Sequence, residues 1–428
     1  MPQPGQAARQ AALDLMTKVT DEGRLLSELL PKSVAYLEPA ERARAGRLAS
    51  EALRWASRAD RVLGPYLRQR PDGRTHNMLR LGVWELCADG AAAHGVVNSA
   101  VEILKARPET VRQAGLVNAI LRKVADNMPD WDALPEPVLP KWLRKPLLAD
   151  YGKAAIAGME RAHAAGAPMD LTPGPRAPAD LAQQLCAEVL PGGSLRLEKP
   201  GQVTALPGYE EGWWWVQDVA AALPARILNS VAGETVIDLC AAPGGKTMQL
   251  AAAGARVTAL DVSEARMARV SENLARTGLT AQTLVADALE WLPPELFDAV
   301  LLDAPCSATG TIRRHPDLPY AKDGSGFPEL FELQSALLDR AIGMLKPGGR
   351  LVYCTCSLLI DEGEEQVRDA LQRHPELIVD LEALGIEGVD ADWIGPEGLR
   401  TRPDFWPDKG GMDGFFIAML RKPAEGIA

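Results

Sequence analysis

The feature that constrains the fold most is the stretch Thr235-Val-Ile-Asp-Leu-Cys-Ala-Ala-Pro-Gly-Gly-Lys-Thr247. It begins as an apolar run rich in β-branched residues, which predicts a buried strand, and it continues after Gly244 and Gly245 with a helical pattern. A strand, a tight glycine turn and a helix N-terminus form the place where open α/β sheets bind ligands. An ordinary strand–helix connection can look the same, so the neighbouring segments must decide.

Strand and helix patterns alternate after this stretch. Apolar strands are expected at 256–261, 281–287, 297–303, 350–356 and 414–420, and helices at 264–277 and 329–345. This alternation predicts a doubly wound, mostly parallel sheet. A chain of 428 residues is too long for one hydrophobic core, so further domains are expected.

The regions before the sheet differ in pattern. Residues 6–130 show helical periodicity almost throughout, which predicts an all-α domain of roughly five to seven helices. Prolines and tryptophans then mark a linker, and residues 166–210 suggest a small α/β insert. We therefore expect domains at 1–130, 131–210 and 211–422.

Two features have both a structural and an RNA-binding interpretation. Arg47, Arg54, Arg58 and Arg61 recur at three- and four-residue spacings, so one helix face should carry them. A solvated face is the commoner meaning of such spacing, and a phosphate-contacting stripe is the alternative. The tryptophans at 213–215 could stack on bases, but burial against the sheet is favoured.

Charge and composition narrow the class of protein. The net charge of −11 argues against indiscriminate binding to nucleic acid. Residues 1–130 nevertheless hold 19 of the 46 Lys and Arg but only 15 of the 57 Asp and Glu, a local balance of +4.

No apolar run reaches membrane-spanning length and no signal-peptide core is recognisable, so we expect a cytoplasmic protein. The cysteines form no C-x-x-C pair and the five histidines are scattered, so no metal site is expected.

Acidic residues at the ends of the expected strands indicate the cofactor. The glycine fingerprint of dinucleotide sites and the phosphate-binding loop of nucleotide triphosphatases are both absent from the first turn. Asp261 suits a ribose diol, while Asp287 and Asp303 follow later strands and can accept hydrogen bonds. A nucleoside without a pyrophosphate fits this set, and S-adenosylmethionine is the natural candidate.

Two further strands end in turns that contain cysteine. These are Asp303-Ala-Pro-Cys-Ser307 and Tyr353-Cys-Thr-Cys-Ser357. Free cysteines are usually buried apolar residues, but two at the same edge of a sheet are more informative. Chemistry at C5 of a pyrimidine requires a thiolate, because C5 becomes nucleophilic only after a thiolate adds to C6.

Taken together, these motifs resemble a known family. The segments 238–246, 303–307 and 355–357 are similar to those of the Nop/Sun-type RNA 5-methylcytosine methyltransferases. The likeness continues through 217–218, 313–317 and 410–416 and covers most of the chain. The helical segments 93–102 and 115–122 look like the NusB-like domain of the bacterial RsmB (Sun) branch. The resemblance implies an RNA-binding all-α domain followed by a Rossmann-like class I methyltransferase domain.

The resemblance also implies roles for individual residues. Cys356 is the expected nucleophile, Cys306 assists product release, Asp303 holds or protonates the base, and Lys246 belongs to the same catalytic set. The expected cofactor-binding residues are Cys240, Ala241, Ala242, Pro243, Gly244, Gly245, Lys246, Asp261, Asp287 and Asp303. The resemblance to the RsmB branch implies unassembled or partly assembled small-subunit rRNA, that is 16S rRNA, as the partner. Neither a membrane nor a metal is expected.

Two departures and two alternatives accompany this interpretation. Ala308 stands where many relatives have Gly, and Met169–Gly174 replaces a usual Arg-x-Asn segment, so no RNA contact is carried over to residues 166–200. The same motifs would serve a methyltransferase of tRNA, another RNA or DNA. A non-catalytic NusB-like RNA-binding factor is the alternative from a different class. The sequence names neither the target nucleotide nor the oligomeric state.

Overall fold

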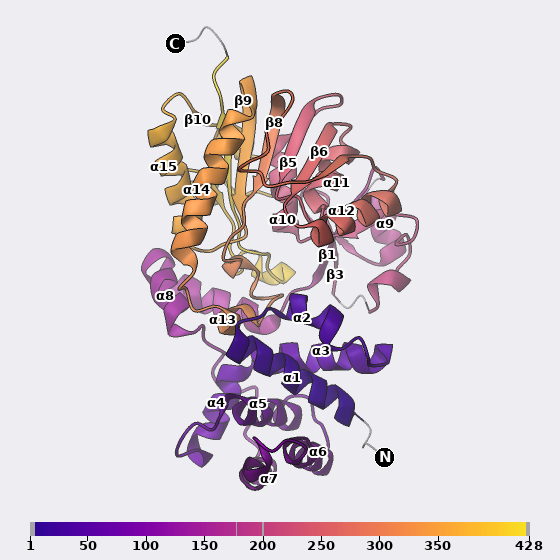
Figure 1. Ribbon diagram of the computed structural model, residues 1–428, viewed down its shortest axis with the longest axis vertical. Coiled ribbons are helices and arrows are strands. Elements are labelled where there is room, and N and C mark those ends of the chain that lie inside the picture. The colour runs from indigo at the N-terminus through magenta and orange to yellow at the C-terminus, as the bar shows by residue number, and fades with distance from the viewer. Residues whose placement is uncertain (1–4, 177, 199–200, 425–428) are drawn as a thin grey trace. The chain divides into compact units, whose positions relative to one another are not determined.

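The computed structural model describes residues 5–176, 178–198 and 201–424 (Figure 1). The chain divides into two compact units, which are described separately: unit 1 is Met1–Gly166 with Ile312–Ser325, and unit 2 is Ala167–Thr311 with Gly326–Ala428. No helix in the described ranges is long and apolar enough to cross a membrane. The first four residues, which entered the signal-peptide argument, lie outside the described residues.

Unit 1 is helical, as the periodicity predicts. Its helices within the described ranges are α1 (Gln6–Glu22), α2 (Leu26–Ser33), α3 (Pro39–Arg54), α4 (Ala56–Leu63), α5 (Gly73–Cys87), α6 (Ala93–Lys105), α7 (Ala114–Asp126), α8 (Lys141–Ala165) and α13 (Leu318–Ala321). Helix α8 consists of two pieces, because Gly152 inside it has non-helical dihedral angles. Helices α1 to α7 fall in the region expected to be all-α.

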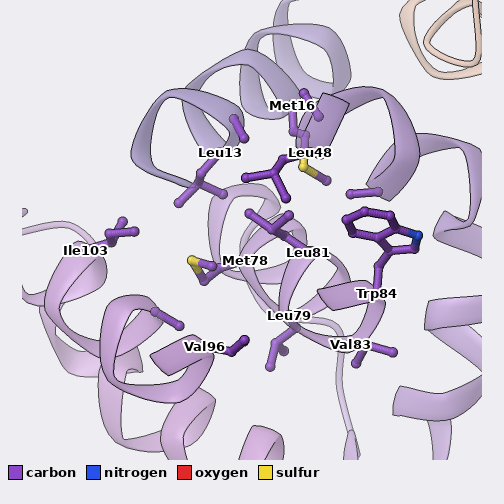
Figure 2. Packing of buried hydrophobic residues seen from close by; sticks show 14 of the residues in the cluster. Leu13, Met16, Leu48, Met78, Leu79, Leu81, Val83, Trp84, Val96 and Ile103 are labelled. Carbon is purple, nitrogen blue, oxygen red and sulfur yellow. The ribbon is translucent and has the colours of Figure 1, made fainter. Parts of the chain in front are cut away.

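The core of unit 1 forms around α5. Residues Thr75–Glu85 of this helix are all buried, which is typical of a helix enclosed by others. Helices α1, α3, α6 and α7 supply apolar side chains to the same cluster. Figure 2 shows part of this packing, with labels on Leu13, Met16, Leu48, Met78, Leu79, Leu81, Val83, Trp84, Val96 and Ile103.

The arginine pattern does not produce one solvated face. The helix breaks at Trp55, and Arg58 just beyond the break is only 3% exposed. The Arg58 guanidinium donates to the carbonyl oxygens of Trp131 and Pro135 and pairs with Glu136 at 2.9 Å. Both expectations for Arg58, exposure to solvent and contact with a phosphate, are therefore wrong, because its N–H groups are hydrogen-bonded within the protein.

The segment Ile312–Ser325 belongs to unit 1, although unit 2 residues flank it on both sides. Arg54 Nη1 donates to the carbonyl oxygen of Arg313 at 2.9 Å. The Asp317 carboxylate accepts a hydrogen bond from the main-chain N–H of Leu26 at 2.7 Å, just at the start of α2. Arg54 therefore also donates a hydrogen bond within the protein. The motif 313–317 contacts residues of the helical unit.

Unit 2 is organised around a mixed sheet. The strands are β5 (Thr235–Leu239), β6 (Arg256–Asp261), β7 (Gln282–Val285), β8 (Phe297–Asp303), β9 (Leu345–Thr355), β10 (Ile378–Val379), β11 (Leu399–Arg400) and β12 (Phe416–Arg421). Their order is β10-β12-β9-β8-β5-β6-β7, with β11 paired to β12. The five strands from β9 to β7 are parallel, and β12 runs antiparallel to β9. The mostly parallel, doubly wound sheet is confirmed.

Helices cover both faces of this sheet (Figure 1). On one face, α14 (Phe327–Gly343) and α15 (Glu364–Arg373) pack on side chains such as Ile237 of β5. On the other face, α10 (Val219–Leu228) and α11 (Gly245–Ala252) pack on side chains such as Val236. Helix α12 (Glu264–Thr277) joins α11 in a further cluster. Both faces are buried, as the continuous apolar character of the strands requires.

A second, smaller sheet precedes the main one within unit 2. Its strands are β1 (Met169–Pro173), β2 (Glu188–Val189), β3 (Leu195–Leu197) and β4 (Trp214–Val216), in the antiparallel order β2-β3-β1-β4, and α9 (Pro178–Leu185) packs on it. Trp214 and Trp215 are buried, as favoured from the sequence. Trp213 is partly exposed beneath the guanidinium of Arg176, 3.7 Å from the ring centroid.

Candidate active site

The sequence-predicted residues converge on the carboxyl ends of the parallel strands. Strands β6, β5, β8 and β9 are consecutive neighbours in the sheet. Their ends carry Asp261, the turn Cys240–Lys246, the pair Asp303 and Cys306, and Cys356, respectively. This is the edge at which open α/β sheets bind ligands.

The turn after β5 presents the start of a helix. Gly244 has a φ of 100°, a conformation that favours glycine, and α11 begins at the next residue. The hydrogen bond that starts this helix runs from the Met248 N–H to the Gly244 carbonyl at 2.9 Å. The N–H groups of residues 245–247 precede it and have no acceptor within the helix, so they suit an anionic group such as a carboxylate.

Two acids can serve a bound nucleoside. Asp261 is buried at the end of β6 and accepts hydrogen bonds from the main-chain N–H groups of Ala242 at 3.2 Å and Ser263 at 3.0 Å. Arg266 Nη1 also lies 3.4 Å from Asp261 Oδ2. Because a carboxylate has about four acceptor sites, Asp261 retains capacity for one hydroxyl of a ribose diol. Asp287 is exposed beyond β7, with one oxygen accepting from the Leu289 N–H at 2.8 Å. These groups and the α11 N-terminus fit S-adenosylmethionine.

Lys246 and Asp303 form the central ion pair of the site. Lys246 Nζ lies 2.7 Å from Asp303 Oδ2, and the lysine is buried while the aspartate side chain is 31% exposed. Burial alone would lower the pKa of Lys246, but the Asp303 charge outweighs it and holds that pKa above its usual value. Cys354 is buried on the same strand edge, and its thiol donates to Asp303 Oδ1 at 3.5 Å. The pair therefore fixes a lysine cation and an aspartate that is partly open to a ligand.

Asp238 adds a second carboxyl group beneath this pair. It is buried in β5, and the Thr247 hydroxyl donates to its Oδ2 at 2.6 Å. Burial raises the pKa of Asp238 to about 7, and the charges of Asp303 and Asp261 act in the same direction, while Thr247 and Lys246 oppose it. The folded protein thus holds a proton here that an unfolded chain releases near pH 4.

This proton predicts a pH dependence of stability. Because the pKa of Asp238 is higher in the folded state, the unfolding free energy contributed by this group is greatest below pH 4 and falls as the pH rises to about 7. Asp238→Asn should remove this decline, which amounts to at most about 4 kcal/mol. Urea unfolding at pH 5 and pH 8 measures it. Asp369→Asn, on an exposed face of α15, is the control, and an unchanged pH 5 to pH 8 difference in Asp238→Asn would refute the prediction.

The two motif cysteines meet. Cys306 follows β8, Cys356 follows β9, and their sulfur atoms lie 3.5 Å apart. The contact with Cys356, together with burial, raises the pKa of Cys306 well above its usual value. Cys306 therefore keeps its proton, and either sulfur can donate in the contact between the two thiols. Cys240 lies elsewhere at this edge, and burial raises its pKa to about 12, so it is no nucleophile.

The glycine-rich motif near the C-terminus supports the Cys356 turn. The Gly310 N–H donates to the Cys356 carbonyl at 3.0 Å, and the Gly414 N–H donates to the Gly310 carbonyl at 2.9 Å. A Cβ on Gly310 would lie 1.9 Å from the Gly414 carbonyl oxygen, so no larger residue fits. Nearby, Ala308 has a φ of 58°, the left-handed region that glycine adopts more readily. A glycine at this position would adopt the same conformation with less strain.

Sequence reasoning missed Glu362, which lies in a 3₁₀ turn (Ile360–Glu362) after β9. Its side chain is 0% exposed and accepts hydrogen bonds from Ser307, the residue next to Cys306. Glu362 is one of four acidic residues in the run Asp361-Glu-Gly-Glu-Glu365, and nothing in this run marks it as the buried one. Its position six residues after Cys356 is the one feature of the sequence that relates it to the site, and this spacing alone does not indicate a role.

This fold and this set of residues define an S-adenosylmethionine-dependent RNA methyltransferase joined to a helical domain. Residues 225–421 match the family described as 16S rRNA methyltransferase RsmB/F, and residues 6–126 match the NusB family. The chain belongs to the RsmB/F methyltransferase family.

Curated relatives agree with this assignment, and solved structures share the fold. The chain is 34% identical to "Ribosomal RNA small subunit methyltransferase B" of Vibrio vulnificus over 97% of this chain and 99% of that protein. The protein of the same name from Vibrio cholerae is also 34% identical, over 97% of each chain. The crystal structure of PH0851 has a TM-score of 0.76 at 24% identity and covers 99% of this chain and 100% of its own. The structure of a methyltransferase homologue from Pyrococcus horikoshii has a TM-score of 0.53 at 27% identity. The match covers 66% of this chain and 95% of that one.

Proposed function

We propose that this protein methylates C5 of a cytosine in small-subunit rRNA through a covalent bond between Cys356 and C6 of the base. The observation that carries the proposal is the 3.5 Å contact between the sulfurs of Cys306 and Cys356 at the ends of adjacent strands. A second thiol beside a nucleophilic thiol has no use in transfer to an oxygen or an exocyclic nitrogen. It has a use where a thiol must first add and then leave.

The proposed reaction uses the two cysteines in sequence. The Cys356 thiolate adds to C6, and the resulting enamine makes C5 nucleophilic. S-adenosylmethionine, when bound, supplies the methyl group that C5 takes up. A base then takes the C5 proton, the C5–H electron pair restores the C5–C6 double bond, and Cys356 leaves C6 as a thiolate. Cys306 holds its proton 3.5 Å from Cys356, so it can donate a hydrogen bond to the departing thiolate.

Asp303 and Lys246 are proposed to act on the base. Addition to C6 is easier when the pyrimidine N3 is protonated or accepts a strong hydrogen bond. Asp303 is the partly exposed acid at the end of β8, and Lys246 holds it in position at 2.7 Å. A carboxylate here can accept a hydrogen bond from a protonated N3 and so favour that form of the base. The cofactor is proposed to lie along residues 240–246 with Asp261 and Asp287.

The RNA is proposed to bind through the whole chain. Residues 1–130, with their excess of basic residues, would dock structured RNA, and the catalytic region 211–422 would take one cytosine out of its stack. The names of the curated relatives make small-subunit rRNA the substrate to test first. Unassembled or partly assembled rRNA is the proposed form, because flipping a base requires an accessible strand.

The test is tritium transfer from labelled S-adenosylmethionine to three substrates: unmethylated small-subunit rRNA, tRNA and duplex DNA. We expect label in rRNA, recovered as 5-methylcytidine after digestion to nucleosides. Label confined to tRNA or DNA would replace the proposed substrate by that one. Label on none of them, with no cofactor binding by calorimetry, would favour a non-catalytic RNA-binding factor.

A further inference from the structure

The buried acid Glu362 joins the two cysteine turns. Its Oε1 accepts hydrogen bonds from the Ser307 N–H at 2.8 Å and from Gln334 Nε2 at 2.9 Å. Its Oε2 accepts from the Ser307 hydroxyl at 2.5 Å. All three partners donate, so both oxygens of the buried carboxyl group are satisfied. No Lys or Arg in the described part of the chain pairs with it, so hydrogen bonds alone compensate its burial.

These bonds hold the residues on both sides of Cys306. Ser307 follows Cys306, and the same Gln334 amide that bonds Glu362 also donates to the carbonyl oxygen of Pro305 at 2.8 Å. Gln334 lies on α14, which packs on the sheet core. Glu362 and Gln334 together therefore fix the main chain immediately before and after Cys306 to a rigid helix.

The main chain of Glu362 holds the other cysteine turn. Its carbonyl oxygen accepts hydrogen bonds from the hydroxyl of Tyr353 at 2.8 Å and from that of Thr355 at 3.1 Å. Thr355 is the residue before Cys356. The main chain of Glu362 thus holds the strand end before Cys356, and the side chain of Glu362 holds the turn that contains Cys306.

A set of hydroxyls completes the connection between the turns. The Ser307 and Ser357 hydroxyl oxygens, each on the residue after a motif cysteine, lie 3.0 Å apart. The Thr309 hydroxyl lies 3.2 Å from both and accepts from the Leu358 N–H at 2.9 Å. This network is buried, so water does not replace these bonds and the spacing of the two turns is fixed by Glu362 and its partners.

We propose that Glu362 is a positioning residue that sets the distance and orientation between Cys306 and Cys356. The role rests on the proposed function only for its catalytic consequence, because the sulfur–sulfur geometry exists whatever the substrate. Glu362 touches neither sulfur in the hydrogen-bond network; it acts through Ser307, Pro305 and Thr355. A displacement of about 1 Å between such groups can lower a rate by about a hundredfold.

The design uses three variants of one segment. Glu362→Ala removes all side-chain bonds to the Cys306 turn. Glu362→Gln keeps the shape, because its oxygen can accept from the Ser307 N–H and Gln334 while its amide donates to the Ser307 hydroxyl. Glu365→Ala is the matched control: it lies three residues away and pairs with the exposed Arg368. Thermal unfolding of each variant checks folding, and Ser307→Ala replaces Glu362→Ala if the latter fails to fold.

The first measurement reports geometry without any RNA. A diazene oxidant takes two electrons and two protons from neighbouring thiols and leaves a disulfide, so the rate of Cys306–Cys356 bond formation measures their alignment. Peptide mapping identifies the bond, and Cys306→Ser shows the background from Cys354. We expect Glu362→Ala to slow the bond at least about tenfold, Glu362→Gln to restore most of the rate, and Glu365→Ala to match the unmodified protein. A rate in folded Glu362→Ala equal to that of the unmodified protein would overturn the proposal.

The second measurement is methyl transfer to rRNA. For Glu362→Ala we expect kcat to fall about a hundredfold with little change in KM for RNA, since the residue is argued to align thiols and not to bind substrate. A change in KM alone would also overturn the proposal. If the unmodified protein forms the disulfide and Glu362→Ala loses it, yet neither methylates any substrate, the proposed function fails while the role of Glu362 stands.

Discussion

Cys356→Ala is expected to abolish methyl transfer, lowering kcat by at least about a thousandfold, the scale seen when a covalent nucleophile is removed. The reason is specific to C5: without addition of a thiolate at C6, this carbon has no nucleophilic character. Cys354 is buried and bonded to Asp303, and the pKa of Cys240 is raised to about 12 by burial. Binding of RNA and S-adenosylmethionine should be unchanged, measured by filter binding and calorimetry.

Cys306→Ala gives the contrasting result for the same mechanism. Cys356 keeps its thiol and can still add to C6, but the neighbouring proton 3.5 Å away is gone. We expect the protein–RNA adduct to accumulate as a species that survives denaturing gel electrophoresis, while Cys356→Ala and the double variant give none. Normal turnover by Cys356→Ala, or an adduct formed by it, would contradict the assignment of the nucleophile.

Lys246→Met has the second largest expected effect, on both activity and stability. Removing the cation leaves Asp303 without its 2.7 Å partner and removes the positive charge that acts on the carboxyl group of Asp238. Breaking a buried pair in this way costs about 3–5 kcal/mol. Because Asp303 is about one-third exposed, we expect the lower end of that range in urea unfolding, and a loss of methyl transfer of at least about a hundredfold.

Asp303→Asn separates the two parts of the Lys246 effect. If the stability loss comes from an uncompensated carboxylate, Lys246→Met combined with Asp303→Asn should be more stable than Lys246→Met alone. Activity should remain lost in the double variant, because the acid that acts on the base is absent. A double variant that is no more stable than the single one would show that Lys246 stabilises the protein by packing instead of charge.

The parts of the fold predicted correctly depend on local patterns. The strand and turn at 235–245 and the helix at 264–277 appear because β-branched runs, glycines and the Ser263 cap carry their own signal. The strand-end cysteines and acids could be placed together for the same reason, since neighbouring parallel strands end at one edge. The contact between Cys306 and Cys356 needs only the order of β8 and β9.

The parts that were missed depend on distant partners. Arg58 has the spacing of a solvated face. Its guanidinium nevertheless donates hydrogen bonds to the carbonyl oxygens of Trp131 and Pro135, which lie 73 and 77 residues further along the chain. Glu362 is one of four acids within five residues, and only the approach of Ser307 and Gln334 satisfies its buried carboxyl group. Spacing within one element cannot reveal acceptors that another element supplies.

The return of Ile312–Ser325 to the helical unit has a consequence for synthesis of the protein. Helices α1 to α8 leave the ribosome first, but the Asp317 carboxylate that bonds Leu26 and the Arg313 carbonyl that bonds Arg54 are made much later. At ordinary translation rates the delay is on the order of 10 s. During that time the nascent helices must persist without their last segment, so the helical unit is complete only after strands β5 to β8 of the other unit have been made.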